Sequence, residues 1–241
     1  MLRRVYIEID EQGNHGVLPL TPPRKVSLRP VILVANSART IIRTATLPDG
    51  YKLNAKTKWA QVLAAFPLGR ALNEKTHLFD GSVYRNAEGR VIFCMVALPL
   101  EVSEAITEQA TALPDFGGGN LKKIAAMETM ETVLFRHFCT AQDTQNMPAT
   151  QAALATRWVI YPCADGIKIL IIRHNTPEAV RFLPLAPPHF EAALHRTLAE
   201  NPPGEVILPT RPLWSDAWVH TRATLVQFFK SEAIKVTDFD L

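Results

Sequence analysis

The clearest pattern in the chain is a pair of apolar, β-branched runs on either side of Asp165-Gly166. The runs Arg157–Cys163 and Ile167–Arg173 are rich in Val and Ile, which favour strands. Asp-Gly favours a tight hairpin turn because both residues tolerate positive φ. A third extended run, Val180–Leu183, follows after a short link that contains proline. We therefore predict a three-stranded meander in this part of the chain.

The first part of the chain alternates apolar runs with patterns of helical period. We expect strands at Val5–Ile9, Gly16–Leu20, Lys25–Leu28, Val31–Val34, Thr40–Leu47, His77–Tyr84 and Val91–Ala97. We expect helices from Ala55 to about Phe66, at Leu100–Ala110 and at Leu121–Phe138. Together these elements predict a first α/β lobe over residues 1–140.

The rest of the chain repeats the order of meander, helix, strand and helix. Residues 141–155 are mostly polar and predict a linker. After the meander we expect a helix at Pro188–Glu200, a strand at Glu205–Leu208, a helix at Trp214–Phe229 and a polar, acidic tail. This order predicts a second, shortened α/β lobe over residues 156–241.

The composition of the chain limits the classes of protein to which it can belong. The chain has 241 residues, 47% of them hydrophobic and 20% charged, which is ordinary for a soluble globular protein. Its net charge of +3 comes from scattered Lys and Arg, so we expect no nucleic-acid partner. The three cysteines form no CxxC pair and favour a reducing compartment. The longest apolar stretch, Val91–Leu100, is half the length of a membrane span, so we expect a cytoplasmic chain.

The sequence contains no motif for catalysis or metal binding. The glycine run Gly117–Gly119 is not followed by the Lys-Ser/Thr pair of a Walker loop. His137 and Cys139 are two residues apart, so on a helix they face different sides and cannot share a metal ion. No serine lies in a GxSxG context. We therefore expect no catalytic residues, no metal site and no enzyme activity.

The last predicted helix carries large apolar side chains along one face, at Trp214, Trp218, Leu225 and Phe229. One interpretation is that this stripe packs against the sheet of the second lobe. The other is that Trp214 and Trp218 anchor a partner, because aromatic residues dominate binding hot spots. We predict that the stripe is mainly buried, with at most one tryptophan left exposed for a partner.

Several segments resemble those of a known protein family in their residue pattern and in their order along the chain. They are Pro30–Pro48, Trp59–Leu72, Glu74–Leu78, Arg90–Ala110, Leu121–Phe135 and the meander that ends at Pro184. Taken together, they resemble the type II secretion system protein L and the type IV pilus assembly protein M. The resemblance implies a two-lobed actin-like ATPase fold of the RNase H-like kind, with the second lobe shortened.

The resemblance also places the turns that hold a nucleotide's phosphates in active members. Asp10 and Gly13 fall at the first of these turns, and Asp165 and Gly166 at the second. The hydroxyl-rich loop expected beside the first turn is missing, and Pro209-Thr210 stands where the family has Gly-Gly beside the adenine. We interpret these positions as vestigial, or as plain hairpin turns, and expect ATP to bind weakly or not at all and no cofactor to be used.

The resemblance implies a non-catalytic scaffold that is cytoplasmic and peripheral to the inner membrane, with its membrane helix absent from this chain. The implied partners are the secretion or pilus assembly ATPase and the tail of an inner-membrane pilus or secretion protein, and a homodimer is a further option. Two alternatives remain open: a nucleotide-binding ATPase like protein M or a sugar kinase, and an unrelated α/β enzyme.

Overall fold

The computed structural model describes residues 5–18, 31–46, 72–73, 75–85, 90–113, 124–139, 156–186, 189–210 and 216–240. Four sequence predictions lie outside these residues. They are the strand at Lys25–Leu28, the helix from Ala55 to Phe66, the loop at Gly117–Gly119 and the linker at 141–155. Trp214 lies outside them as well.

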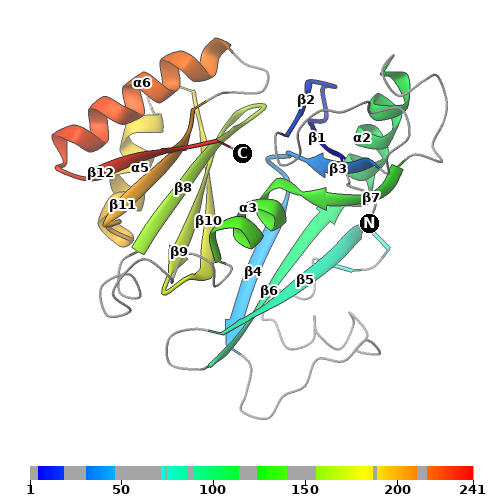
Figure 1. Ribbon diagram of the computed structural model, residues 1–241, viewed down its shortest axis with the longest axis horizontal. Helices are drawn as coiled ribbons and strands as arrows, with labels where there is room; N and C mark the ends of the chain where they lie inside the picture. Colours follow the sequence, from blue (N-terminus) through cyan, green and yellow to red (C-terminus); the bar gives the residue numbers. More distant parts are fainter. Residues whose placement is uncertain are drawn as a thin grey trace.

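The second lobe is built on a mixed five-stranded sheet (Figure 1). Its strands are β8 (Thr156–Cys163), β9 (Gly166–Arg173), β10 (Thr176–Pro184), β11 (Glu205–Pro209) and β12 (Lys235–Phe239). They lie in the order β10-β9-β8-β11-β12. Strand β9 is antiparallel to both neighbours, whereas β8, β11 and β12 are parallel to one another. This 3-2-1-4-5 order with an antiparallel second strand is that of an RNase H-like, actin-like lobe, so the predicted fold class and meander are confirmed.

The two faces of this sheet pack against different helices, because successive side chains along a strand point to opposite faces. On β8, Trp158 and Ile160 point into a core with the helices α5 (His189–Glu200) and α6 (Asp216–Ser231). Val159 and Tyr161 point to the opposite face, which α3 (Met130–Cys139) covers. Figure 1 shows α5 and α6 on one side of the sheet and α3 on the other.

The first lobe contains a sheet of the same design. Its strands are β1 (Val5–Ile9), β2 (His15–Val17), β3 (Val31–Ala35) and β7 (Ile124–Thr129), in the order β2-β1-β3-β7. Strand β2 is antiparallel to β1, and β1, β3 and β7 are parallel. This arrangement repeats β9-β8-β11-β12 of the second lobe. Helix α2 (Leu100–Ala112) packs on the sheet through Val102, Ile106 and Ala110.

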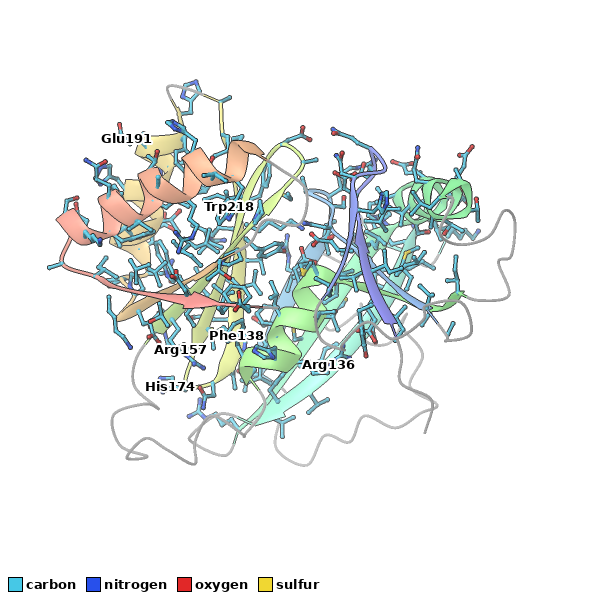
Figure 2. The ribbon with its side chains drawn as sticks, turned by 45° about the horizontal axis from the view of Figure 1, so that its top comes forward. Arg136, Phe138, Arg157, His174, Glu191 and Trp218 are labelled. Carbon is cyan, nitrogen blue, oxygen red and sulfur yellow. The ribbon has the colours of Figure 1, made fainter. Side chains whose placement is uncertain are left out.

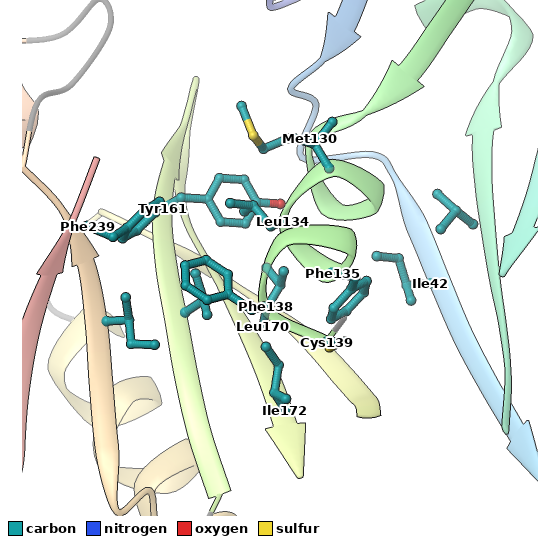
Figure 3. Packing of buried hydrophobic residues seen from close by; sticks show 14 of the residues in the cluster. Ile42, Met130, Leu134, Phe135, Phe138, Cys139, Tyr161, Leu170, Ile172 and Phe239 are labelled. Carbon is teal, nitrogen blue, oxygen red and sulfur yellow. The ribbon is translucent and has the colours of Figure 1, made fainter. Parts of the chain in front are cut away.

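Residues between β3 and β7 in the sequence form a separate antiparallel sheet, which we call the inserted sheet. It consists of β4 (Ile41–Thr46), β6 (Val91–Pro99) and β5 (His77–Arg85), in the order β4-β6-β5. Helix α3 lies between this sheet and that of the second lobe, and its apolar side chains are buried on both sides (Figure 3). Phe135, Phe138, Leu170 and Ile172 belong to one cluster, so a single core joins the lobes.

Three sequence predictions were wrong in detail. The helix expected at Leu121–Phe138 begins only at Met130, because Ile124–Thr129 pairs with β3 as strand β7. The acidic tail contains strand β12, whose parallel pairing with β11 gives it an extended conformation. The tight turn between β8 and β9 is Ala164-Asp165, since Gly166 already pairs with Cys163.

Candidate functional site

The first predicted phosphate turn is held closed by its own aspartate. Asp10 Oδ1 accepts hydrogen bonds of 2.9 Å from the backbone N–H groups of Gln12 and Asn14. Asp10 Oδ2 accepts a third, of 2.8 Å, from the Asn14 amide. Gly13 has φ of +84°, a conformation that favours glycine. The Asp10 side chain is buried and its oxygens hold the hairpin, which leaves it poorly placed to bind magnesium.

At the second predicted turn, Gly166 allows β10 to pack closely against β9. A Cβ added to Gly166 would lie 2.3 Å from the carbonyl oxygen of Leu183, so only glycine allows β10 to approach this closely. The expectation of positive φ was wrong for Asp165 and Gly166. In this meander it is His174 and Asn175, in the turn between β9 and β10, that have positive φ. Asp165 itself is exposed at the tip of its hairpin.

The structure brings these two turns to the same end of the molecule, one from each lobe (Figure 1). Each turn follows the first strand of its sheet, so the repeated sheet design places them equivalently. The lobes touch just below the turns, where the Asn36 amide donates a 2.8 Å hydrogen bond to the carbonyl oxygen of Pro162. This junction is where the actin-like resemblance places a nucleotide.

A buried group of polar side chains fills the junction, and we call it the interlobe polar cluster. Its members are Glu8, Asn36, Ser37, Glu131, Tyr161 and Lys168, all of them buried. Lys168 Nζ donates to Glu131 Oε1 and to the carbonyl oxygen of Ser37. Lys168 is 1% exposed and Glu131 is fully buried. Such buried charges persist in proteins only when they are paired.

Of the other members, Tyr161 contacts this ion pair directly, while Asn36 and Glu8 bond to each other. The Tyr161 hydroxyl donates a 2.8 Å hydrogen bond to Glu131 Oε1. Burial, and after it the Glu131 carboxylate, raises the pKa of Tyr161 well above its ordinary value, so the phenol stays protonated and donates. The Asn36 amide donates to Glu8 Oε1 at 2.5 Å. Glu131 Oε2 and Asn36 Oδ1 are buried with no hydrogen-bond partner in the described part of the chain.

A bound nucleotide and magnesium ion would make specific demands on this junction. Phosphates need backbone N–H groups presented by a loop of small residues, and magnesium needs a free carboxylate. Among the described residues, the Asp10 carboxylate is engaged in its own turn and Glu131 is paired with Lys168. These residues therefore do not fit a nucleotide with magnesium. The assignment of Asp10, Gly13, Asp165 and Gly166 as vestigial nucleotide positions stays a prediction.

Sequence reasoning missed Glu131 and Lys168, although the position of Lys168 in the sequence is unusual. Lys168 is the only charged residue in the apolar run Ile167–Ile172, which the meander prediction places in a strand. A lone charge in such a run needs a buried partner. The sequence did not identify that partner, because Glu131 lies 37 positions away on another element.

A groove of about 260 Å³ lies in the first lobe, between the inserted sheet and β7. Leu78, Val96 and Leu98 give it an apolar floor, and Met127 adds to it from β7. Asp80 and Glu128 also line it. The Glu128 carboxylate is paired with Arg136, whereas Asp80 is exposed. Strands β5 and β7 are each paired on one side only within the described sheets, so both present backbone edges here.

The aromatic stripe of α6 is part of the core. Trp218 is 2% exposed, and Leu225 and Phe229 are fully buried in the cluster that includes Trp158. Figure 2 shows Trp218 on the side of α6 that faces the sheet. This burial supports the packing interpretation over a partner anchor at Trp218.

No protein-family model matches the chain, and no curated protein does. It is similar to several solved structures. One is a PilM–PilN type IV pilus biogenesis complex, at 16% identity and a TM-score of 0.46 over 84% of this chain and 52% of that one. Our chain thus spans about half of the pilus protein's length.

Two further solved structures are similar to the chain. A Bacteroides thetaiotaomicron protein with an actin-like ATPase fold and unknown function has 12% identity and a TM-score of 0.47, over 98% of this chain and 90% of that one. The cytoplasmic domain of EpsL, an inner-membrane component of the type II secretion system of Vibrio cholerae, has 11% identity and a TM-score of 0.48, over 88% and 83%. Both systems named by the sequence resemblance are therefore among these structures, while the fold assignment rests on the sheet orders given above.

Within the described residues, no helix is long and apolar enough to cross a membrane. In the same part of the chain, no three His, Cys, Asp or Glu side chains gather as a metal ion would require.

Proposed function

We propose that this protein is a non-catalytic cytoplasmic scaffold of a type II secretion or type IV pilus assembly machine. It would stand at the inner membrane and link the assembly ATPase to membrane components. The observation that carries the proposal is the interlobe polar cluster, in which Lys168 and Glu131 are paired at the junction where an actin-like ATPase holds its nucleotide. A two-lobed fold retained around such a junction favours a role that does not depend on a bound nucleotide.

The groove between β5 and β7 is the surface we assign to a membrane partner. An extended segment can add to a free strand edge through main-chain hydrogen bonds, while its side chains enter an adjoining pocket. Leu78 on β5 is 45% exposed and lines the groove, so it offers an apolar contact to such a segment.

The exposed carboxylate of Asp80 in the groove favours a basic segment. Cytoplasmic segments next to a membrane helix carry an excess of Lys and Arg. A short cytoplasmic tail with apolar residues and a basic residue would therefore match both the apolar side chains of the groove and the exposed carboxylate of Asp80. This chemistry fits the tail of an inner-membrane secretion or pilus protein.

Co-purification with a matched pair of variants tests the proposal. Leu78→Lys replaces an apolar groove residue with a cation, which would repel a basic tail. Val83→Lys makes the same change on the same strand, at a position that is 51% exposed and is not among the groove's lining residues. We expect the tagged parent and Val83→Lys to recover a secretion-type ATPase and an inner-membrane protein, and Leu78→Lys to lose the membrane protein.

Two outcomes would contradict the proposal. Recovery of metabolic enzymes alone, together with turnover of a small phosphorylated substrate, would favour the sugar-kinase alternative and overturn the scaffold. Equal recovery of the membrane protein by both variants would show that the groove is not its binding surface.

A further inference from the structure

We propose that Lys168 is an internal cation that ties the two lobes together, so that the junction is closed without nucleotide or magnesium. The inference goes beyond the proposed scaffold role and would hold whether or not a membrane tail binds the groove. It follows from the contacts of Asp10 and Glu131, which leave neither carboxylate available to bind magnesium.

The contacts of Lys168 cross from one lobe to the other. The residue lies on β9 of the second lobe, and its two hydrogen-bond acceptors belong to the first part of the chain. One is the carbonyl oxygen of Ser37, just after β3, and the other is the Glu131 carboxylate in the first turn of α3. A single ammonium group therefore holds three elements, and because the site is almost free of solvent it is weakly screened by salt.

The surrounding groups support this role of the ammonium. The Tyr161 ring centroid lies 6.0 Å from Lys168 Nζ, within the range of a cation–π contact. The Asn36–Pro162 hydrogen bond makes a second, neutral link between the lobes beside it. A divalent cation at the Glu131 carboxylate would meet the positive charge of Lys168, so the pair disfavours magnesium at that carboxylate.

A separate contact ties the far end of α3 to the second lobe. Arg157 donates hydrogen bonds of 3.0 Å to the carbonyl oxygen of Phe138 and 2.7 Å to Asn175 Oδ1. Figure 2 shows Arg157 beside Phe138 at the end of that helix. Loss of the Lys168 pair should therefore open the lobes at the end with the two turns, while the other end stays joined.

Distance measurement between spin labels tests the proposal. Glu104→Cys on α2 and Asp165→Cys at the second turn place labels on exposed sites of different lobes. The native cysteines are buried and free, so labelling should be selective for the added sites. We expect one narrow distance distribution in the parent, unchanged by ATP with magnesium. Lys168→Met should shift it to longer distances and broaden it.

Since Lys168→Met leaves Glu131 unpaired and could fail to fold, the double variant Glu131→Gln/Lys168→Met provides a second route. Removing both partners avoids the buried unpaired charge, so this variant should fold and still show the longer distances. Lys235→Met is the matched control, because it breaks a Lys–Glu pair within the second lobe, with Glu205, and should leave the distribution unchanged.

Two results would overturn the proposal. One is a folded double variant with the parent's distance distribution. The other is a parent distribution that shifts when ATP and magnesium are added, which would mean that Lys168 serves as a phosphate-binding lysine. Neither result depends on whether Leu78→Lys loses the membrane protein, so the two proposals fail separately.

Discussion

Replacement of Phe229 by alanine should destabilise the second lobe strongly. Phe229 is fully buried between α6 and the sheet, and its ring meets that of Trp158 edge to face, with centroids 5.9 Å apart. Truncating a buried Phe to Ala typically costs about 3–5 kcal/mol, since apolar contacts are lost and a cavity remains. The edge-to-face pair contributes about 0.5–1.5 kcal/mol beyond buried area, which favours the upper part of that range.

Urea denaturation followed by far-ultraviolet circular dichroism measures this loss of unfolding free energy directly. In a thermal melt, each kcal/mol lowers Tm by about 2–4 °C in a chain of this length, so Phe229→Ala should melt about 6–20 °C below the parent. Val219→Ala is the control on the same helix. Val219 is 62% exposed, so its truncation should change the stability by about 0.5 kcal/mol or less.

A Phe229→Ala variant that unfolds within about 1 kcal/mol of the parent would refute this reasoning, because a buried aromatic residue cannot be removed from a packed core at so small a cost. If that variant also lost a binding partner, the stripe would be an interface and the packing interpretation would be wrong.

Three further predictions concern titration and backbone packing. Burial raises the pKa of both the Cys94 and Cys163 thiols to about 12, so neither should react with an aromatic disulfide reagent at neutral pH until the chain is unfolded; prompt reaction of the native protein would contradict this. Burial opposes ionisation of Glu205, but hydrogen bonds from Lys235 and Thr237 outweigh it and lower its pKa below 4.5. That stabilisation is present above this pH and is lost below it, so the stabilities of the parent and Glu205→Gln should converge in acid denaturation series; a constant difference would refute it. Gly166→Ala should cost about 1–3 kcal/mol in urea denaturation, since its Cβ meets the backbone of β10, and parent-like stability would contradict that close approach.

The sequence predicted the second-lobe meander because its strands carry strong local signals. Continuous apolar runs between short turns are typical of strands buried on both faces, as β8 and β9 are. Strand β7 was missed because its residues, Ala125 to Glu128 among them, are good helix formers that continue the pattern of α3. Pairing with β3 outweighs that local preference.

The candidate site was predictable only in part, for a different reason. The two turns could be found, since each is a local feature of a few residues. Lys168 contacts Glu131, which is 37 positions away in the sequence, and Ser37, which is 131 positions away. These groups meet Lys168 only once both sheets and α3 are in place. Likewise, β12 is short and mostly polar, and its pairing with β11 joins segments 30 residues apart, such as Glu205 and Lys235.

Calorimetric titration of the purified chain with ATP and magnesium tests the central claim most directly. The claim is that an actin-like fold is retained here while the nucleotide junction is filled by the protein's own Lys168–Glu131 pair. We expect no saturable heat of binding with or without magnesium, under conditions in which an active actin-like ATPase gives a clear isotherm. A magnesium-dependent affinity in the micromolar range would contradict the account.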